Sequence, residues 1–173
     1  MGISLYDATI PSNIQMIDAL SALLDKAEAF CAEKGLAPED IIQARIVDDM
    51  LPFAYQVKSV AVHSIGAIEG VRRGHFSPDT STPPDSFAGL KQRLTEARAA
   101  LAALDPAEIE SFIGRDMAFV FGEHRIAFTA DQFLLSFSQP NFYFHVTTAY
   151  DILRGKGLAI GKRDYLGRQR RKG

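Results

Sequence analysis

The chain has 173 residues, of which 47% are hydrophobic and 23% are charged. This composition is ordinary for a folded protein and unlike that of a disordered one. A chain of this length can bury a core without metals or disulfides, so we expect one domain over residues 1–173. The single cysteine, Cys31, excludes an internal disulfide and a zinc site built from several thiols.

No apolar run approaches the roughly 18 residues of a membrane span. The N-terminal stretch MGISLYDATIPSN also lacks the basic start and apolar middle of a signal peptide. With one unpaired cysteine, these features favour a reducing compartment. We therefore expect a cytoplasmic protein that does not enter a membrane.

Charge is distributed unevenly along the chain. The C-terminal tail, residues 162–173, holds six Lys or Arg against one Asp and carries a charge of +5, whereas the preceding 161 residues carry −7. Such a tail could bind nucleic acid or an acidic partner, or it could be a solvated end that contacts the acidic body of its own chain. Short basic ends are common, so we do not expect nucleic acid as a partner.

Helical periodicity dominates the first half of the chain. Apolar residues recur every three or four positions and predict a helix over residues 11–34, with Pro11 in its first turn and an inert, buried Cys31 on its apolar face. A second helical pattern covers residues 38–72. Pro52 interrupts it, because proline lacks the N–H of the helical hydrogen bond and clashes with the preceding turn. We expect a kink or two consecutive helices there.

The pattern changes further along the chain. A loop rich in Pro, Ser, Thr and Asp is expected over residues 74–85, followed by a third helix over residues 86–104. In DMAFVFGEHRIAF the apolar spacing is no longer helical, and the Gly122–Glu123 pair favours a two-residue turn. We therefore predict a small β-hairpin over Met117–Phe128.

The last helix is expected to begin at Thr129, where the spacing to Gln132 is typical of a capping box. Pro140 predicts a kink, and Gly155 or Gly157 predicts the end of the helix. The whole pattern indicates an all-α protein. Its expected architecture is an up-and-down four-helix bundle with a small β-hairpin inserted before the last helix.

One histidine raises the question of function, because His145 lies among aromatic residues on the inner face of the last helix. At 100° per residue, Asn141 and Thr148 project to the same side of the last helix as His145. Asp49 and Gln56 are seven positions apart in the second helical pattern and project in similar directions. The candidate lining of a polar pocket is therefore His145, Gln56, Asp49, Thr148 and Asn141. Two interpretations stay open: a core histidine that is simply hydrogen-bonded, and a residue of a ligand pocket.

Three segments carry a resemblance to known proteins. DDMLPFAYQV (48–57), PNFYFHVTTAYDILRGKG (140–157) and IGKRDYLG (160–167) resemble an uncharacterised bacterial family of the DinB/YfiT-like superfamily. The resemblance implies a four-helix bundle that is often dimeric. Better-known members of the superfamily depend on metals and include transferases and isomerases that use low-molecular-weight thiols.

The superfamily's metal site takes one histidine from the second helix and a His-x-x-x-His pair from the last. His145 matches the first member of that pair, but Ala149 stands at the second position, and Gln56 is the ligand-type residue expected on the second helix. His63 lies further toward the outside in this interpretation, and Asp49 could add one oxygen. Catalytic zinc usually has three protein ligands, so we expect no cofactor, with Zn or Ni at His145 as the weaker alternative.

Two functions follow from these residues. The first is a metal-free module that binds a small ligand or a partner through a degenerate DinB-type site. The alternative is a metal- or thiol-dependent transferase or isomerase that uses His145.

Apolar residues also wrap around the last helix, where Phe144 and Tyr143 lie on opposite flanks, and this breadth predicts a homodimer.

Overall fold

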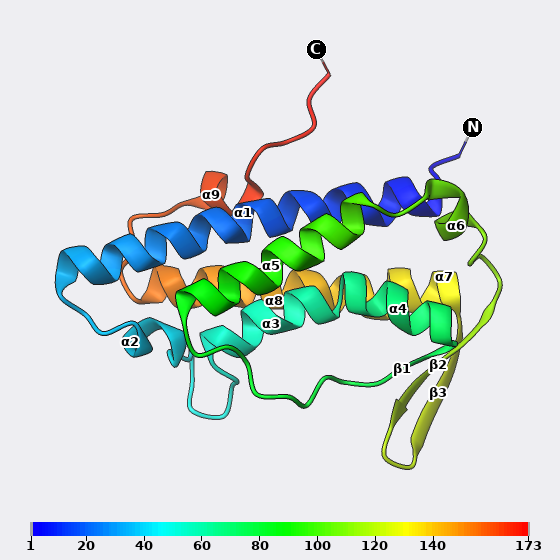
Figure 1. Ribbon diagram of the computed structural model, residues 1–173, viewed down its shortest axis with the longest axis horizontal. Coiled ribbons are helices and arrows are strands. Elements are labelled where there is room, and N and C mark those ends of the chain that lie inside the picture. The colour runs from blue at the N-terminus through cyan, green and yellow to red at the C-terminus, as the bar shows by residue number, and fades with distance from the viewer. Residues whose placement is uncertain (1, 173) are drawn as a thin grey trace.

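The computed structural model describes residues 2–172 and is mostly helical, with long helices side by side and a small sheet at one end (Figure 1). Four helices precede the sheet and α5 follows its first strand. They are α1 (Leu5–Lys34), α2 (Glu39–Ile42), α3 (Phe53–Val62), α4 (Ile65–Arg73) and α5 (Phe87–Ala102). The remaining helices are α6 (Pro106–Glu110), α7 (Ala130–Gln132), the π-helical segment η1 (Phe133–Ser138), α8 (Gln139–Gly155) and α9 (Lys162–Leu166).

Helix α1 begins at Leu5, six residues before the expected start. The Ser4 hydroxyl accepts a hydrogen bond from the backbone N–H of Asp7 at 3.0 Å and caps the helix. Pro11 therefore lies inside the helix, not at its first turn. Cys31 is buried as expected, and burial raises the pKa of its thiol, with smaller contributions from the nearby acidic side chains.

The second helical pattern is more broken than expected. Residues 43–52 are not helical, and α3 begins directly after Pro52. A second break, at His63–Ser64, separates α3 from α4. The Ser64 hydroxyl donates to the Val60 carbonyl at 2.7 Å, which compensates locally for the interrupted helix.

The last long helix contains a π-helical segment in place of a simple kink. Helix α7 begins near the expected position, but the Thr129 side chain makes no capping hydrogen bond, so the predicted capping box is wrong. Segment η1 then leads into α8, where Pro140 occupies the first turn. The wider π turn accommodates a residue that lacks an N–H, because the hydrogen-bond ladder shifts register there. Helix α8 ends at Gly155, as expected.

The predicted hairpin is confirmed and is part of a three-stranded sheet of order β1–β2–β3. Strands β2 (Asp116–Phe121) and β3 (His124–Thr129) pair antiparallel around Gly122, whose φ of 58° suits glycine. The additional strand, β1 (His75–Phe76), pairs in parallel with β2. The expected loop therefore begins with a short strand that ties the end of α4 to the hairpin.

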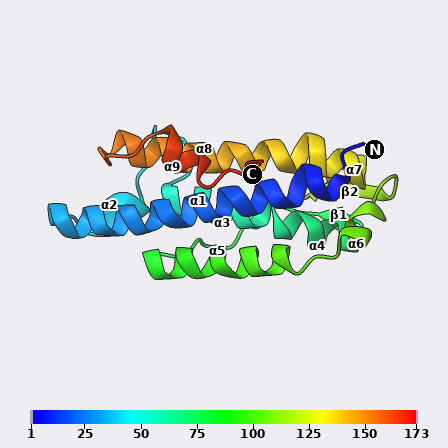
Figure 2. The same ribbon diagram turned by 90° about the horizontal axis from the view of Figure 1, so that it is seen from above.

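The helices share one apolar core. Helix α1 packs against α5, α8 and α9, while α3 packs against α5 and α8, as the view from above shows (Figure 2). The largest fully buried side chains include Phe53, Phe112, Phe133 and Phe142, and also the cationic Lys58. Among residues 2–172, no helix combines the length and apolarity needed to cross a membrane.

The basic tail begins with α9 and contacts its own chain. Lys26 of α1 forms an ion pair with Asp164 at 2.5 Å, and Gln15 donates to the Leu166 carbonyl at 2.8 Å. Further along, Arg170 donates to the Pro11 carbonyl at 2.7 Å. The tail thus contacts its own chain, which was one of the two interpretations of its positive charge.

Candidate functional site

A cleft of about 340 Å³ lies where α3 meets η1 and α8, next to the sheet. It is lined by two imidazole rings, a tyrosine and three phenylalanines, and His63 packs against Phe76 and Phe137. The lining residues are Leu51, Tyr55, Ser59, Val62, His63, Phe76, Pro78, Asp79, Phe119, Phe137, Asn141 and His145. Clefts of this size and mixed character are typical of sites for small molecules.

His145 lines the cleft and forms a hydrogen bond with Gln56, a buried residue that does not line it. The His145 Nδ1 atom lies 2.7 Å from the Gln56 Oε1 atom, and both side chains are buried. The Gln56 amide nitrogen donates to the Leu51 carbonyl at 2.8 Å, which fixes the orientation of the amide. The oxygen must then accept from His145, so the imidazole carries its proton on Nδ1 and keeps a lone pair on Nε2.

His63 is the second histidine of the cleft, and the expectation that it lies further toward the outside is wrong. Its ring centroid lies 5.5 Å from that of His145, with an angle of 19° between the planes. The His63 Nδ1 atom is buried and has no hydrogen-bond partner within residues 2–172. Its spacing of seven residues from Gln56 puts both on one face of α3, and this spacing was the signal available in the sequence.

Both imidazoles are neutral at pH 7. Burial lowers the pKa of His145 to about 4, because the charged form loses its hydration. Burial also lowers the pKa of His63 to about 4, and the neighbouring His145 adds to the effect. The cleft therefore presents uncharged rings with lone pairs.

The other predicted site residues have different positions. Asn141 lines the cleft, but its amide donates to the Phe137 carbonyl at 2.7 Å. Thr148 is buried one turn further along α8 and does not line the cleft. Asp49 lies in an exposed turn outside any helix. Its prediction as a pocket residue is wrong, because its alignment with Gln56 required a regular helix between these two residues, and residues 49–52 are not helical.

The donor set does not fit the metal site that the resemblance implies. His145 has one ring nitrogen engaged by Gln56, and residue 149 is alanine. Together with His63 this gives two imidazoles, whereas catalytic zinc usually has three protein ligands. In the part of the chain that the structure describes, no three His, Cys, Asp or Glu side chains converge to hold a metal ion.

Comparison with known proteins assigns the family. The family model described as "Domain of unknown function (DUF1993)" matches residues 5–166. The chain belongs to this family. This DUF1993 chain is also similar to the crystal structure of a DinB family member protein from Shewanella denitrificans, with 27% sequence identity and a TM-score of 0.82. The match covers 98% of this chain and 95% of the other, while no protein of curated function matches.

A double-mutant cycle tests the hydrogen bond between His145 and Gln56 in this DUF1993 domain. We expect His145→Ala and Gln56→Ala each to lower the free energy of unfolding by about 1–3 kcal/mol, because each leaves a buried polar partner unsatisfied. The double variant should lose less than the sum, since the second change then removes a group that has already lost its partner. Urea unfolding of the four proteins measures the difference.

The control for this cycle is Thr148→Val. Thr148 is buried on the same helix but does not contact the His145–Gln56 pair through a hydrogen bond. Its effect should therefore add to that of His145→Ala. Additive effects of His145→Ala and Gln56→Ala would contradict the interaction.

The stability should also depend on pH in a defined direction. The pKa of His145 falls from its ordinary 6.5 to about 4 on folding, so below pH 6.5 the unfolded chain binds a proton that the folded chain does not. The free energy of unfolding should decrease as the pH falls from 6.5 to 4, by up to about 3 kcal/mol for this residue, and its contribution should level off below pH 4. Urea unfolding across this range should show a smaller loss in His145→Gln; equal losses in the two proteins would disprove the assignment.

Proposed function

We propose that this chain is a small-molecule-binding protein built on a DinB-type, up-and-down four-helix bundle, and that it binds its ligand without a metal. The hydrogen bond between His145 and Gln56 is the observation that carries the proposal. It holds the imidazole in one tautomer, with the Nε2 lone pair available as an acceptor. A buried acceptor in a preformed cleft suits recognition of a ligand that donates a hydrogen bond.

The walls of the cleft define the rest of the ligand. Phe76, Phe119 and Phe137 pack near one another, with ring centroids 5.1 Å apart for Phe119 and Phe137. Tyr55 also lines the cleft, with its ring centroid 6.0 Å from that of His145. An uncharged, flat or aromatic molecule with one O–H or N–H group matches these walls and this acceptor.

The alternative function is an enzyme in which His145 acts as a base or a metal ligand. A general base is most effective when its pKa is close to the working pH. With a pKa of about 4, His145 is a weak base at neutral pH. Two imidazoles are also fewer protein ligands than a catalytic metal ion usually has. Both arguments favour binding over catalysis.

The test uses phenol and toluene as probes, together with elemental analysis. The two probes have similar size and shape, but only phenol can donate a hydrogen bond to His145 Nε2. We expect phenol to bind at least about tenfold more tightly, a difference of about 1.4 kcal/mol, and to shift the histidine side-chain signals in NMR. His145→Phe should abolish the preference.

Two outcomes would contradict the proposal. Equal binding of phenol and toluene would remove the role of the His145 acceptor. A stoichiometric transition metal, in protein purified without chelators or a metal-affinity tag, would favour the metal-dependent alternative. Thr148→Val should keep the preference for phenol and serves as the matched control.

We also propose that the chain forms a homodimer. On α8 the Phe144 side chain is 54% exposed, whereas Tyr143 packs against the core. Aromatic side chains are enriched at interfaces between proteins, and Phe144 is the candidate for such a contact on α8. Sedimentation at micromolar concentration should show a dimer that Phe144→Glu dissociates, and a monomeric parent protein would contradict the proposal. Residence in the cytoplasm and the single-domain organisation stay predictions.

A further inference from the structure

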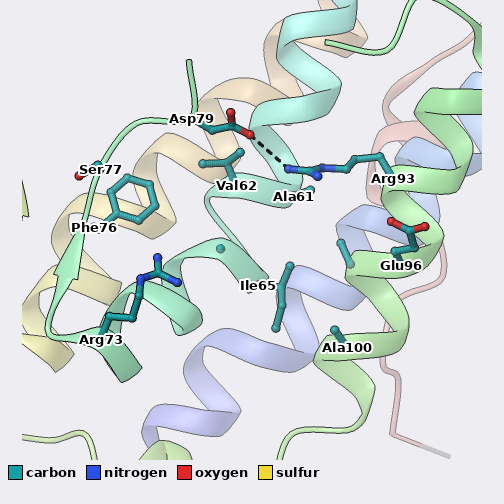
Figure 3. Close-up of a pocket in the computed structure, with 12 residues that line it drawn as sticks. Ala61, Val62, Ile65, Arg73, Phe76, Ser77, Asp79, Arg93, Glu96 and Ala100 are labelled. Atoms are coloured by element: carbon teal, nitrogen blue, oxygen red, sulfur yellow. Dashed lines mark hydrogen bonds and ion pairs between the residues drawn. The ribbon is translucent and has the colours of Figure 1, made fainter. Parts of the chain in front are cut away.

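A second cleft, of about 360 Å³, opens between α4, α5 and the loop that follows β1 (Figure 3). It shares Val62, Phe76 and Asp79 with the first cleft, but none of its lining residues is a histidine. Its floor is apolar and its rim is charged. The floor consists of Ala61, Val62, Ile65, Gly66, Phe76, Ala97 and Ala100.

Asp79, which forms an ion pair with Arg93 of α5, is also paired with a buried lysine. Lys58 is only 2% exposed, and its ammonium lies 3.2 Å from the Asp79 Oδ1 atom. The same ammonium donates to the backbone carbonyls of Asp79 and Ser81 at 2.7 and 2.5 Å. Burial opposes ionisation of Asp79, but hydrogen bonds from Ser81 and Lys58 outweigh it and lower the pKa of the carboxyl group. Lys58 and Asp79 thus form a neutral pair.

Arg93 therefore adds a positive charge that this pair does not balance. One of its terminal nitrogens lies 3.3 Å from the Asp79 Oδ2 atom, as the dashed line in Figure 3 shows. Its Nε atom is buried without a hydrogen-bond partner within residues 2–172. A guanidinium has five N–H donors in a planar fork, so a single long contact leaves most of its capacity unused.

Arg73 provides a second cation at the opposite wall of the cleft. Figure 3 shows its side chain rising from the end of α4 beside Phe76, while Arg93 crosses from α5. The adjacent Arg72 is occupied by ion pairs with Glu69 and Glu108. In the part of the chain that the structure describes, Arg73 forms no such ion pair and faces the cleft.

We propose that this second cleft binds a small organic carboxylate with an apolar body. The rim carries two arginines, and its remaining acid, Glu96, leaves a net charge of +1 once the Lys58–Asp79 pair is counted as neutral. One negative charge on the ligand balances that value. Arginine matches the geometry of a carboxylate through paired N–H donors, and the alanine and isoleucine floor accommodates an apolar group.

Phenylacetate is the test probe, with two comparison compounds. The ester methyl phenylacetate has a similar shape without the charge and without an O–H group that the first cleft would bind, and inorganic phosphate has the charge without the apolar body. We expect saturable binding of phenylacetate with a Kd of about 1 mM or tighter, and binding of each comparison compound that is at least about tenfold weaker. Calorimetry or NMR titration measures all three.

Three variants locate the site. Arg93→Met and Arg73→Met should each weaken phenylacetate binding by about tenfold, because each removes a charged donor from the ligand. Arg98→Met is the matched control on α5, since Arg98 pairs with Asp18 and does not line the cleft. Arg93→Met also removes a contact to Asp79, so Arg73→Met shows whether the loss is due to the ligand contact.

The outcomes separate this proposal from the one for the first cleft. His145→Gln should leave phenylacetate binding unchanged even if it abolishes binding of phenol. The proposal fails if phenylacetate does not saturate, if methyl phenylacetate or phosphate binds equally well, or if Arg98→Met weakens binding as much as Arg73→Met.

Discussion

The candidate site depends on the Gln56 side chain, which joins two segments that are far apart in the sequence. Its amide donates to the Leu51 carbonyl just before α3 and accepts from His145 on α8. The amide can make both bonds in only one of its two orientations, so the bond to Leu51 determines that the oxygen faces His145. This constraint fixes the imidazole tautomer and the direction in which the remaining lone pair points.

The irregular parts of the helices gather around this interaction. The break after α3 leaves His63 at a helix end, where its carbonyl accepts a hydrogen bond from the Ser138 hydroxyl at 2.7 Å. Ser138 ends the π-helical segment, which also supplies Phe137 to the cleft. π-Helical segments often occur at functional sites. Here the interruption of regular hydrogen bonding is compensated by side-chain contacts between α3 and the π segment.

A buried lysine holds the loop that contributes to both clefts. Lys58 lies on α3 and holds the loop after β1 through two backbone carbonyls and Asp79. Asp79 lines both clefts, so the position of this loop defines a wall of each. A buried ammonium is tolerated only when it is paired and hydrogen-bonded, and the loop backbone provides those partners. Membership of the DUF1993 family and the likeness to a DinB structure describe the scaffold, while these side chains give this chain its particular sites.

Local patterns in the sequence were sufficient for much of the fold and for one residue of the site. The apolar spacing predicted α1, α5 and the long last helix, because a helix buries one face every 3.6 residues regardless of its neighbours. The turn at Gly122 predicted the hairpin for a similarly local reason. His145 was identified as inward-facing, and Gln56 was among its expected partners.

Local sequence patterns were therefore enough to locate α1, α5, the last long helix and the hairpin turn, and to show that His145 points inward. What His145 contacts there follows from the tertiary structure. Asp49 was misplaced because the helical geometry was extended through residues that are not helical, and Lys58 gave no local sign that a distant loop would cover it. The proximity of His63 to His145 arises from the packing of α3 against α8. Such contacts depend on helix breaks and on the relative positions of distant segments, which periodicity within one segment does not encode.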